Sequence, residues 1–416
     1  MTSSTFFWIF VALYFTHQVA ETALTFLNMA HTRKHQGKIP AYFKDKMDGE
    51  RYQKSIRYTL ERSWFGVVIR WLKVPFLWAV ILWGGFSALD GFLSSYLDSS
   101  TLIFSVAYCL AIGFILLLTG IPVSLYSNFV IEKKFGFNKM TAKLFFLDQL
   151  KMLALGAAFG LPILFLIFWL YEVSGPLWWL WAFLSVFGFE LFVAAVYPTF
   201  LAPLFNKFTP LPNGELKNRI LELAQKIRFK LSGIFTIDGS KRSSHSNAYF
   251  AGIGRFRRIV LFDTLQSQLS ESEIVAVLGH EMGHNKKRHI QKHLILSFVI
   301  EGIGFWILSL AIEWEPLYGA FRAGSLAPYK ALVLFSLFGG HFTFFLTPLS
   351  NYLSRKHEYE ADRFSVEVVG DKASMASSLV KLSKENLSNL TPHPLYSFYY
   401  YSHPTTLERV QAIENT

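Results

Sequence analysis

The chain has 416 residues, of which 52% are hydrophobic, and its 17% share of charged residues lies below the roughly 25% of an average soluble domain. With a mean hydropathy of +0.32, this composition favours a membrane protein, and the net charge of +11 implies no nucleic-acid partner because Lys and Arg cluster between apolar segments. The single cysteine, Cys109, excludes an intramolecular disulfide and a cysteine-based zinc site, so a bound metal needs His and carboxylate ligands.

Seven apolar stretches are each about long enough to cross the roughly 30 Å hydrocarbon core of a bilayer, and they predict seven membrane helices. They lie near 5–28, 66–93, 101–126, 146–172, 177–204, 291–313 and 330–352. The segments between them alternate in charge, with Lys and Arg concentrated in 32–63, 127–145 and 205–290. By the positive-inside rule this alternation predicts an N-terminus outside and a cytoplasmic 205–290 segment and C-terminus.

The 205–290 segment is predicted to be a small α+β insert between two spans. Residues 214–229 have the periodicity of an amphipathic helix, and Ile234–Ile237, Asn247–Phe250 and Arg258–Phe262 are typical of short strands. A helix is predicted over 270–289, opened by Ser270 and Glu273 in a capping-box pattern.

The last span is predicted to continue as a helix over 353–369, followed by helices over 371–387 and 404–415. The chain therefore divides into 1–204 with membrane helices 1–5, the insert 205–290, 291–352 with helices 6–7, and a C-terminal helical segment 353–416. The predicted class is a mainly α integral membrane protein with a small α+β insert.

The motif LGHEMGH, residues 278–284, carries the strongest chemical signal. On a helix, His280 and His284 lie one turn apart on one face, so both imidazoles can bind one zinc ion. Glu281 can take a proton from the attacking water and return it to the leaving amine. His289, five residues after His284, is rotated off that face and is interpreted as a surface or supporting residue.

A catalytic zinc site needs a third protein ligand, and NYLSRKHEYEAD at 351–362 offers one. Glu358 is the candidate ligand, giving one His-His-Glu zinc site per chain. Asp362, one turn further, can accept a proton from the distal nitrogen of a ligating histidine. These two motifs together predict a zinc-dependent endopeptidase.

LGHEMGH, SRKHEYEAD and SKRSSHSNAYFAGIGRFRRIVLFDTL (240–265) together resemble the type I CAAX prenyl endopeptidases, and the resemblance covers essentially the whole chain. It implies seven helices enclosing a chamber with the zinc inside, and a peptide or protein substrate that is prenylated in that family. It also implies roles for individual residues. The zinc ligands would be His280, His284 and Glu358, and Glu281 would be the catalytic base. Asn247, Ala248 and Tyr249 would form the edge strand that binds the substrate. His403 of SHPTTLER (402–409) would stabilise the oxyanion, and Arg355 would pair inside the site.

Two features depart from the eukaryotic members of that family. Few residues separate Leu265 from the zinc helix, and no ER retrieval signal is visible, so a bacterial inner-membrane protein is expected, or an ER membrane protein if the source is eukaryotic. The prenylated substrate is carried over from the resemblance alone.

Two other functions stay open. One is a membrane quality-control protease, similar to the heat-shock membrane protease that shares the zinc motif. The other is a seven-helix transporter or receptor with incidental histidines, which would place ionisable residues inside the spans. The sequence has such residues: Glu21, Asp90, Asp148, Glu190, Glu301 and His341.

Overall fold

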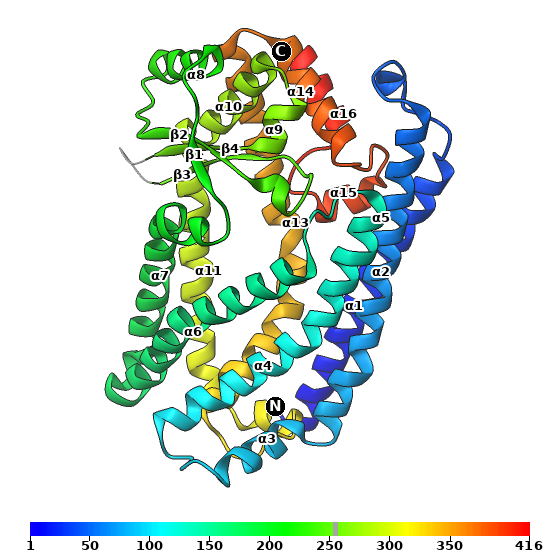
Figure 1. Cartoon of the computed structure of the whole chain (residues 1–416). Coiled ribbons are helices and arrows are strands. Elements are labelled where there is room, and N and C mark those ends of the chain that lie inside the picture. Colours follow the sequence, from blue (N-terminus) through cyan, green and yellow to red (C-terminus); the bar gives the residue numbers. More distant parts are fainter. Residues whose placement is uncertain (253–256) are drawn as a thin grey trace.

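The computed structural model describes residues 1–252 and 257–416, so residues 253–256 of the 240–265 motif lie outside the described part. Long helices form most of the molecule, with α1 beside α2 and α7 beside α11 (Figure 1). A small sheet and the C-terminal helices gather at one end, and the two chain termini lie at opposite ends. The site-bearing elements are thus collected at the end of a helical body.

Six helical segments of the described chain are long and apolar enough to cross a membrane. They are α2 (Gly49–Leu82), α4 (Leu102–Tyr126) extended through a π-helical turn (Ser127–Glu132) and α5 (Lys133–Phe135), α6 (Ala142–Val173), α7 (Trp178–Val196) with its flanking turns over Gly175–Leu204, α11 (His289–Ile312) and α13 (Pro328–Val369). Only 11–22% of each apolar window is buried within the protein. Surfaces this apolar need lipid around them.

The first predicted span, 5–28, forms the helix α1 (Ser3–Lys34), which is not among these six. The predicted stretch 66–93 is wrong at its end: the helix α2, which begins at Gly49, ends at Leu82, and a separate helix α3 (Gly85–Ser94) follows. Gly84 between them has φ of 69°, a left-handed conformation that glycine adopts without a Cβ clash and that interrupts a helix.

The insert contains a four-stranded sheet in the order β1-β2-β4-β3. Its strands are β1 (Phe208–Pro210), β2 (Gly233–Ile237), β3 (Ala248–Ala251) and β4 (Arg258–Phe262), with β2 and β4 parallel and the other two pairs antiparallel. Among the described strands β3 pairs with β4 alone, so its other edge is free. The three predicted strands are confirmed, whereas β1 was not predicted because three residues leave too short a pattern.

Three helices pack against this sheet: α8 (Glu215–Lys226), α9 (Asp263–Gln268) and α10 (Glu271–Lys286). Apolar side chains such as Ile220, Ile259 and Leu278 form their common core. The predicted capping box is confirmed, since Ser270 and Glu273 bond each other's backbone N–H groups at the start of α10. Arg288, with φ of 56°, separates α10 from α11.

Two glycines allow α10 to lie directly against α13. A Cβ on Gly283 would lie 3.1 Å from the Cα of Ala361, and a Cβ on Gly279 would lie 2.8 Å from the Oγ of Ser365. Both positions face α13 because they are four residues apart, the same spacing as the two motif histidines. The motif therefore places its glycines against α13 and its histidines beside that contact.

The predicted last span and its extension form one continuous helix, α13, of 42 residues. Three helices follow it: α14 (Lys372–Glu385), α15 (Pro394–Tyr400) and α16 (Thr406–Glu414). A short helix α12 (Glu315–Ala320) precedes α13. Of these, α12 and α15 were not predicted.

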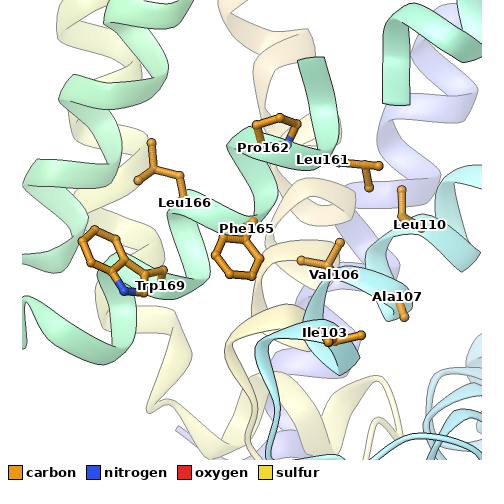
Figure 2. A pocket seen from close by; sticks show the side chains of 9 residues that line it. All are labelled: Ile103, Val106, Ala107, Leu110, Leu161, Pro162, Phe165, Leu166 and Trp169. Carbon is orange, nitrogen blue, oxygen red and sulfur yellow. The ribbon is translucent and has the colours of Figure 1, made fainter. Parts of the chain in front are cut away.

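An apolar cavity of about 680 Å³ lies between α4 and α6, at a distance from the histidine motif along the helical body (Figures 1 and 2). Figure 2 labels its lining side chains, which are apolar throughout: Ile103, Val106, Ala107, Leu110, Leu161, Pro162, Phe165, Leu166 and Trp169. It offers no acid, base or metal ligand, so the chemistry of this protein lies elsewhere.

Candidate metal centre

Three candidate ligand side chains converge where α10 meets α13. The Nε2 atoms of His280 and His284 are 3.0 Å apart, and the Glu358 carboxylate oxygens lie 3.4 Å from the first and 3.2 Å from the second. Ligands bonded to tetrahedral zinc at about 2.0–2.1 Å are separated by about 3.3 Å. Among the described residues this is the one group of three His, Cys or acidic side chains that can hold a metal.

The chemistry of these side chains also suits zinc. His280 and Glu358 are buried, and the Oε2 of Glu358 accepts no hydrogen bond from any described residue, although buried oxygens are usually bonded. Burial works to lower the pKa of His280, but the neighbouring carboxylates of Asp362 and Glu358 outweigh it and raise the pKa to about 9. A proton and a metal ion therefore compete for the same nitrogen.

Asp362 and Arg409 support His280 from behind. The Oδ1 of Asp362 lies 2.7 Å from the Nδ1 of His280, and an N–H on that nitrogen leaves Nε2 free for a metal. Arg409 of α16 donates to both Asp362 oxygens, from Nε at 2.8 Å and from Nη2 at 2.6 Å. Its Nη1 also lies 3.4 Å from Glu358, so one cation balances two buried carboxylates.

Glu281 faces a cavity of about 440 Å³ beside the ligand cluster. Burial raises the pKa of its carboxyl group, which moves a carboxylate toward the range useful for a general base at neutral pH. The cavity is also lined by His280, Glu358, Asn247, Ala248 and His403. The structure thus gathers residues from β3, α10, α13 and the segment before α16 around one space.

The remaining predicted site residues differ in position. His403 is 60% exposed, with its Nε2 3.4 Å from Glu358 and its Nδ1 2.9 Å from the Ser402 hydroxyl. Tyr249 does not line the cavity, because alternate residues of β3 face opposite sides, and its ring packs against Phe262.

The expectation that Arg355 pairs inside the site is wrong. Its guanidinium donates to the carbonyl groups of Phe398 and Tyr401, at 3.0 and 2.6 Å, because its position on α13 faces α15. Arg409 pairs with the site carboxylates instead. Arg409 is the last residue of SHPTTLER, but its role could not be predicted, because its pairing with Asp362 spans 47 residues and leaves no local pattern in the sequence.

Comparisons with known proteins agree with this arrangement. The family described as the CAAX prenyl protease N-terminal region, with five membrane helices, matches residues 28–207, and peptidase family M48 matches residues 210–416. CAAX prenyl protease 1 of Saccharomyces cerevisiae is 36% identical over 408 residues, covering 91% of this chain and 88% of that protein. The human homologue is 33% identical, covering 90% and 88%.

The crystal structure of Ste24p from S. mikatae has the same fold. It superposes with a TM-score of 0.91 at 33% identity, covering 98% of this chain and 99% of that one. Both halves of the chain thus match one kind of protein over nearly its full length. This chain belongs to the type I CAAX prenyl endopeptidases of peptidase family M48, which are membrane zinc metalloendopeptidases.

Proposed function

We propose that this chain binds one zinc ion through His280, His284 and Glu358 and cleaves CAAX-type C-terminal peptides of prenylated substrates. The observation that carries the proposal is the convergence of three ligand side chains, with 3.0 Å between the two Nε2 atoms and 3.2–3.4 Å from these to the Glu358 oxygens, beside a cavity that also holds Glu281. The names of the related proteins suggest the substrate class.

The residues around the cavity suit the steps of peptide hydrolysis. When bound, zinc supplies the Lewis acidity that makes water nucleophilic near neutral pH and polarises a carbonyl group. Glu281 accepts the proton of the attacking water and delivers it to the leaving amine. His403 donates a hydrogen bond to the oxygen that becomes negative as the carbonyl carbon turns tetrahedral.

The free edge of β3 offers backbone groups to a substrate. An extended peptide adds to such an edge by main-chain hydrogen bonds, which hold its scissile bond beside the ligand cluster. Asn247 and Ala248 lie where this edge enters the cavity, and Tyr249 follows along the strand. The Oδ1 of Asn247 accepts from the N–H of Ala248 at 2.8 Å and so steadies the first residue of the strand.

In the membrane we propose that α1 is a seventh span, that the helices enclose a chamber, and that the insert and the C-terminus are cytoplasmic. The opposite placement of the termini in Figure 1 supports an odd number of crossings. The basic segments 32–63, 127–145 and 205–290 support the orientation. The short connection from Leu265 to α10 supports a bacterial inner-membrane protein.

Neither alternative function gains support. The family matches span the membrane helices and the peptidase together. Several ionisable groups that a transporter would use have structural partners within 3.1 Å. These pairs are Glu21 with Arg70, Asp90 with Lys330, and Asp148 with Arg242.

The test is cleavage of a fluorogenic farnesylated CAAX peptide by the detergent-purified protein, with zinc content measured on the same sample. Glu281→Gln keeps the size of the side chain and removes the base, so kcat should fall about 10²–10⁴-fold while zinc stays at about one per chain. A chelator should abolish the wild-type activity and added zinc should restore it.

The outcomes separate the parts of the proposal. A protein that holds zinc but cleaves only unprenylated peptides has the proposed centre and a different substrate class. A protein that neither binds zinc nor cleaves any peptide contradicts the proposal altogether.

A further inference from the structure

We propose that His289 and Glu360 orient the zinc ligand His284, as a carboxylate acting through a second imidazole. The inference rests on the zinc site proposed above and concerns residues outside its ligand set. His289 is 1% exposed, yet peptide hydrolysis as derived above gives it no task. A buried imidazole in contact with a ligand needs a physical account.

The three side chains form a line leading away from the ligand cluster. The Nδ1 of His284 lies 3.0 Å from the Nδ1 of His289, and the Nε2 of His289 lies 3.0 Å from the Oε2 of Glu360. Each contact is within hydrogen-bond distance. The line runs from α10 through the first residue of α11 to α13, so it also joins the three elements that surround the site.

The direction of each hydrogen bond follows from the carboxylate. Ionised Glu360 only accepts, so the Nε2 of His289 carries the proton and donates it. In neutral His289 the Nδ1 is then an acceptor, and it accepts a hydrogen bond from the N–H group at the Nδ1 of His284. That leaves the Nε2 of His284 with a free lone pair, which is the atom that faces His280 and Glu358.

The two zinc histidines thus receive equivalent support by different routes. Asp362 accepts directly from the Nδ1 of His280, whereas Glu360 acts on His284 through His289. Carboxylates behind ligating histidines fix the tautomer and the ring orientation, and losing one typically weakens metal binding about 10–100-fold.

The ring of His289 is held in the plane that this arrangement requires. His357 of α13 stacks on it with ring centroids 4.0 Å apart and 13° between planes. Arg288, with φ of 56°, turns the chain so that α11 begins at His289, beside His284. The break between α10 and α11 therefore positions the His289 imidazole beside His284.

The test is the zinc dissociation constant of the full-length protein, measured by competition with a chromogenic chelator. His289→Phe keeps a ring that can stack on His357 and removes both nitrogens, and it should raise the constant about tenfold. Glu360→Gln should raise it by a smaller factor. The double variant should be no weaker than His289→Phe alone, because Glu360 acts only through His289.

Gln291→Ala is the matched control, since Gln291 is an exposed residue on the first turn of α11, and it should leave the constant unchanged. If His289→Phe does not fold, Glu360→Gln alone carries the test, because that side chain is partly exposed. An unchanged constant in both single variants, or additive effects in the double variant, overturns the inference. A wild-type protein without zinc instead overturns the proposed function.

Discussion

Arg409 is the side chain on which the charge balance of the site depends, because it is the cation that contacts both Glu358 and Asp362. Replacing it with Met keeps much of its volume and leaves two buried carboxylates unbalanced. We expect the metal-free protein to lose about 3 kcal/mol of stability, since breaking a buried ion pair from one side is costly. Thermal unfolding in detergent measures this loss.

Arg363→Met serves as the control for Arg409→Met, because Arg363 lies next to Asp362 on α13 but is exposed. Its unfolding temperature should stay near that of the wild type. Equal effects of the two substitutions would show that the balance does not depend on Arg409. Added zinc should restore part of the loss in the Arg409 variant, since the ion supplies positive charge beside Glu358.

For single residues, the sequence predicts those site features that depend on the spacing of residues along one helix. His280 and His284 are one turn apart, as are Glu358 and Asp362, and each pair indicates one helix face. Nothing local connects Arg409 with Asp362 or Arg355 with Tyr401, because these contacts depend on how distant helices pack. The roles of Asn247 and His403 in catalysis stay predictions.

At the scale of elements, the contact between α10 and α13 sets the distance between the histidines and Glu358. Gly283→Ala places a Cβ 3.1 Å from backbone atoms of Ala361, which cannot rotate away. We expect about 1–3 kcal/mol of destabilisation and weaker zinc binding, because the helices must separate by a few tenths of an ångström. Unfolding and zinc affinity measured together check this.

Gly304→Ala is the control for this contact. A Cβ at Gly304 of α11 meets nothing within 4 Å, so the substitution should change stability by no more than about 1 kcal/mol. If Gly283→Ala behaves like Gly304→Ala, the close contact does not constrain the site.

Glu273 makes the anchoring of α10 dependent on pH. Burial works to raise the pKa of Glu273, but hydrogen bonds from Lys381, Ser377 and Ser270 outweigh it and lower the pKa. A carboxyl group with a lowered folded pKa stabilises the protein above its unfolded value of about 4.3, and this contribution is lost as pH falls through the folded value.

We therefore expect Glu273→Gln to cost about 1–2 kcal/mol at pH 7 and progressively less at acid pH. Unfolding temperatures of both proteins from pH 7 down to about pH 2, below the unfolded pKa of a glutamate, measure the convergence. Glu408→Gln is the control for loss of a capping box alone, since Glu408 caps α16 from an exposed position. A Glu273 deficit that stays constant down to about pH 2 would contradict the expectation.

Helix existence was easier to predict than helix ends. Apolar length indicated every long span, but α2 extends back to Gly49 through a basic region, where Tyr52 and Ile56 pack into a core shared with α14 and α16. Short elements such as β1 and α15 exist because neighbours hold them, and their own sequences carry too few residues for a periodic signal.

For the whole molecule, the placement of the two ends can be tested with single cysteines. In a Cys109→Ser background, Ser99→Cys marks the turn after α3, and Glu414→Cys marks the C-terminal helix. In right-side-out vesicles, a membrane-impermeant maleimide should label Ser99→Cys and should reach Glu414→Cys only after permeabilisation. Labelling of both from one side would contradict the proposed orientation.

The 42 residues of α13 correspond to roughly 63 Å of helix, about twice the hydrocarbon thickness of a bilayer. One continuous helix therefore begins as an apolar span and ends as the support for Glu358 and Asp362. The helix runs without a loop from the span through Pro348 to these two residues, so the membrane part and the peptidase part share one helix. Cutting this helix at the membrane surface would separate Glu358 and Asp362 from the membrane span that holds them. The bilayer around that span therefore helps to position the active site.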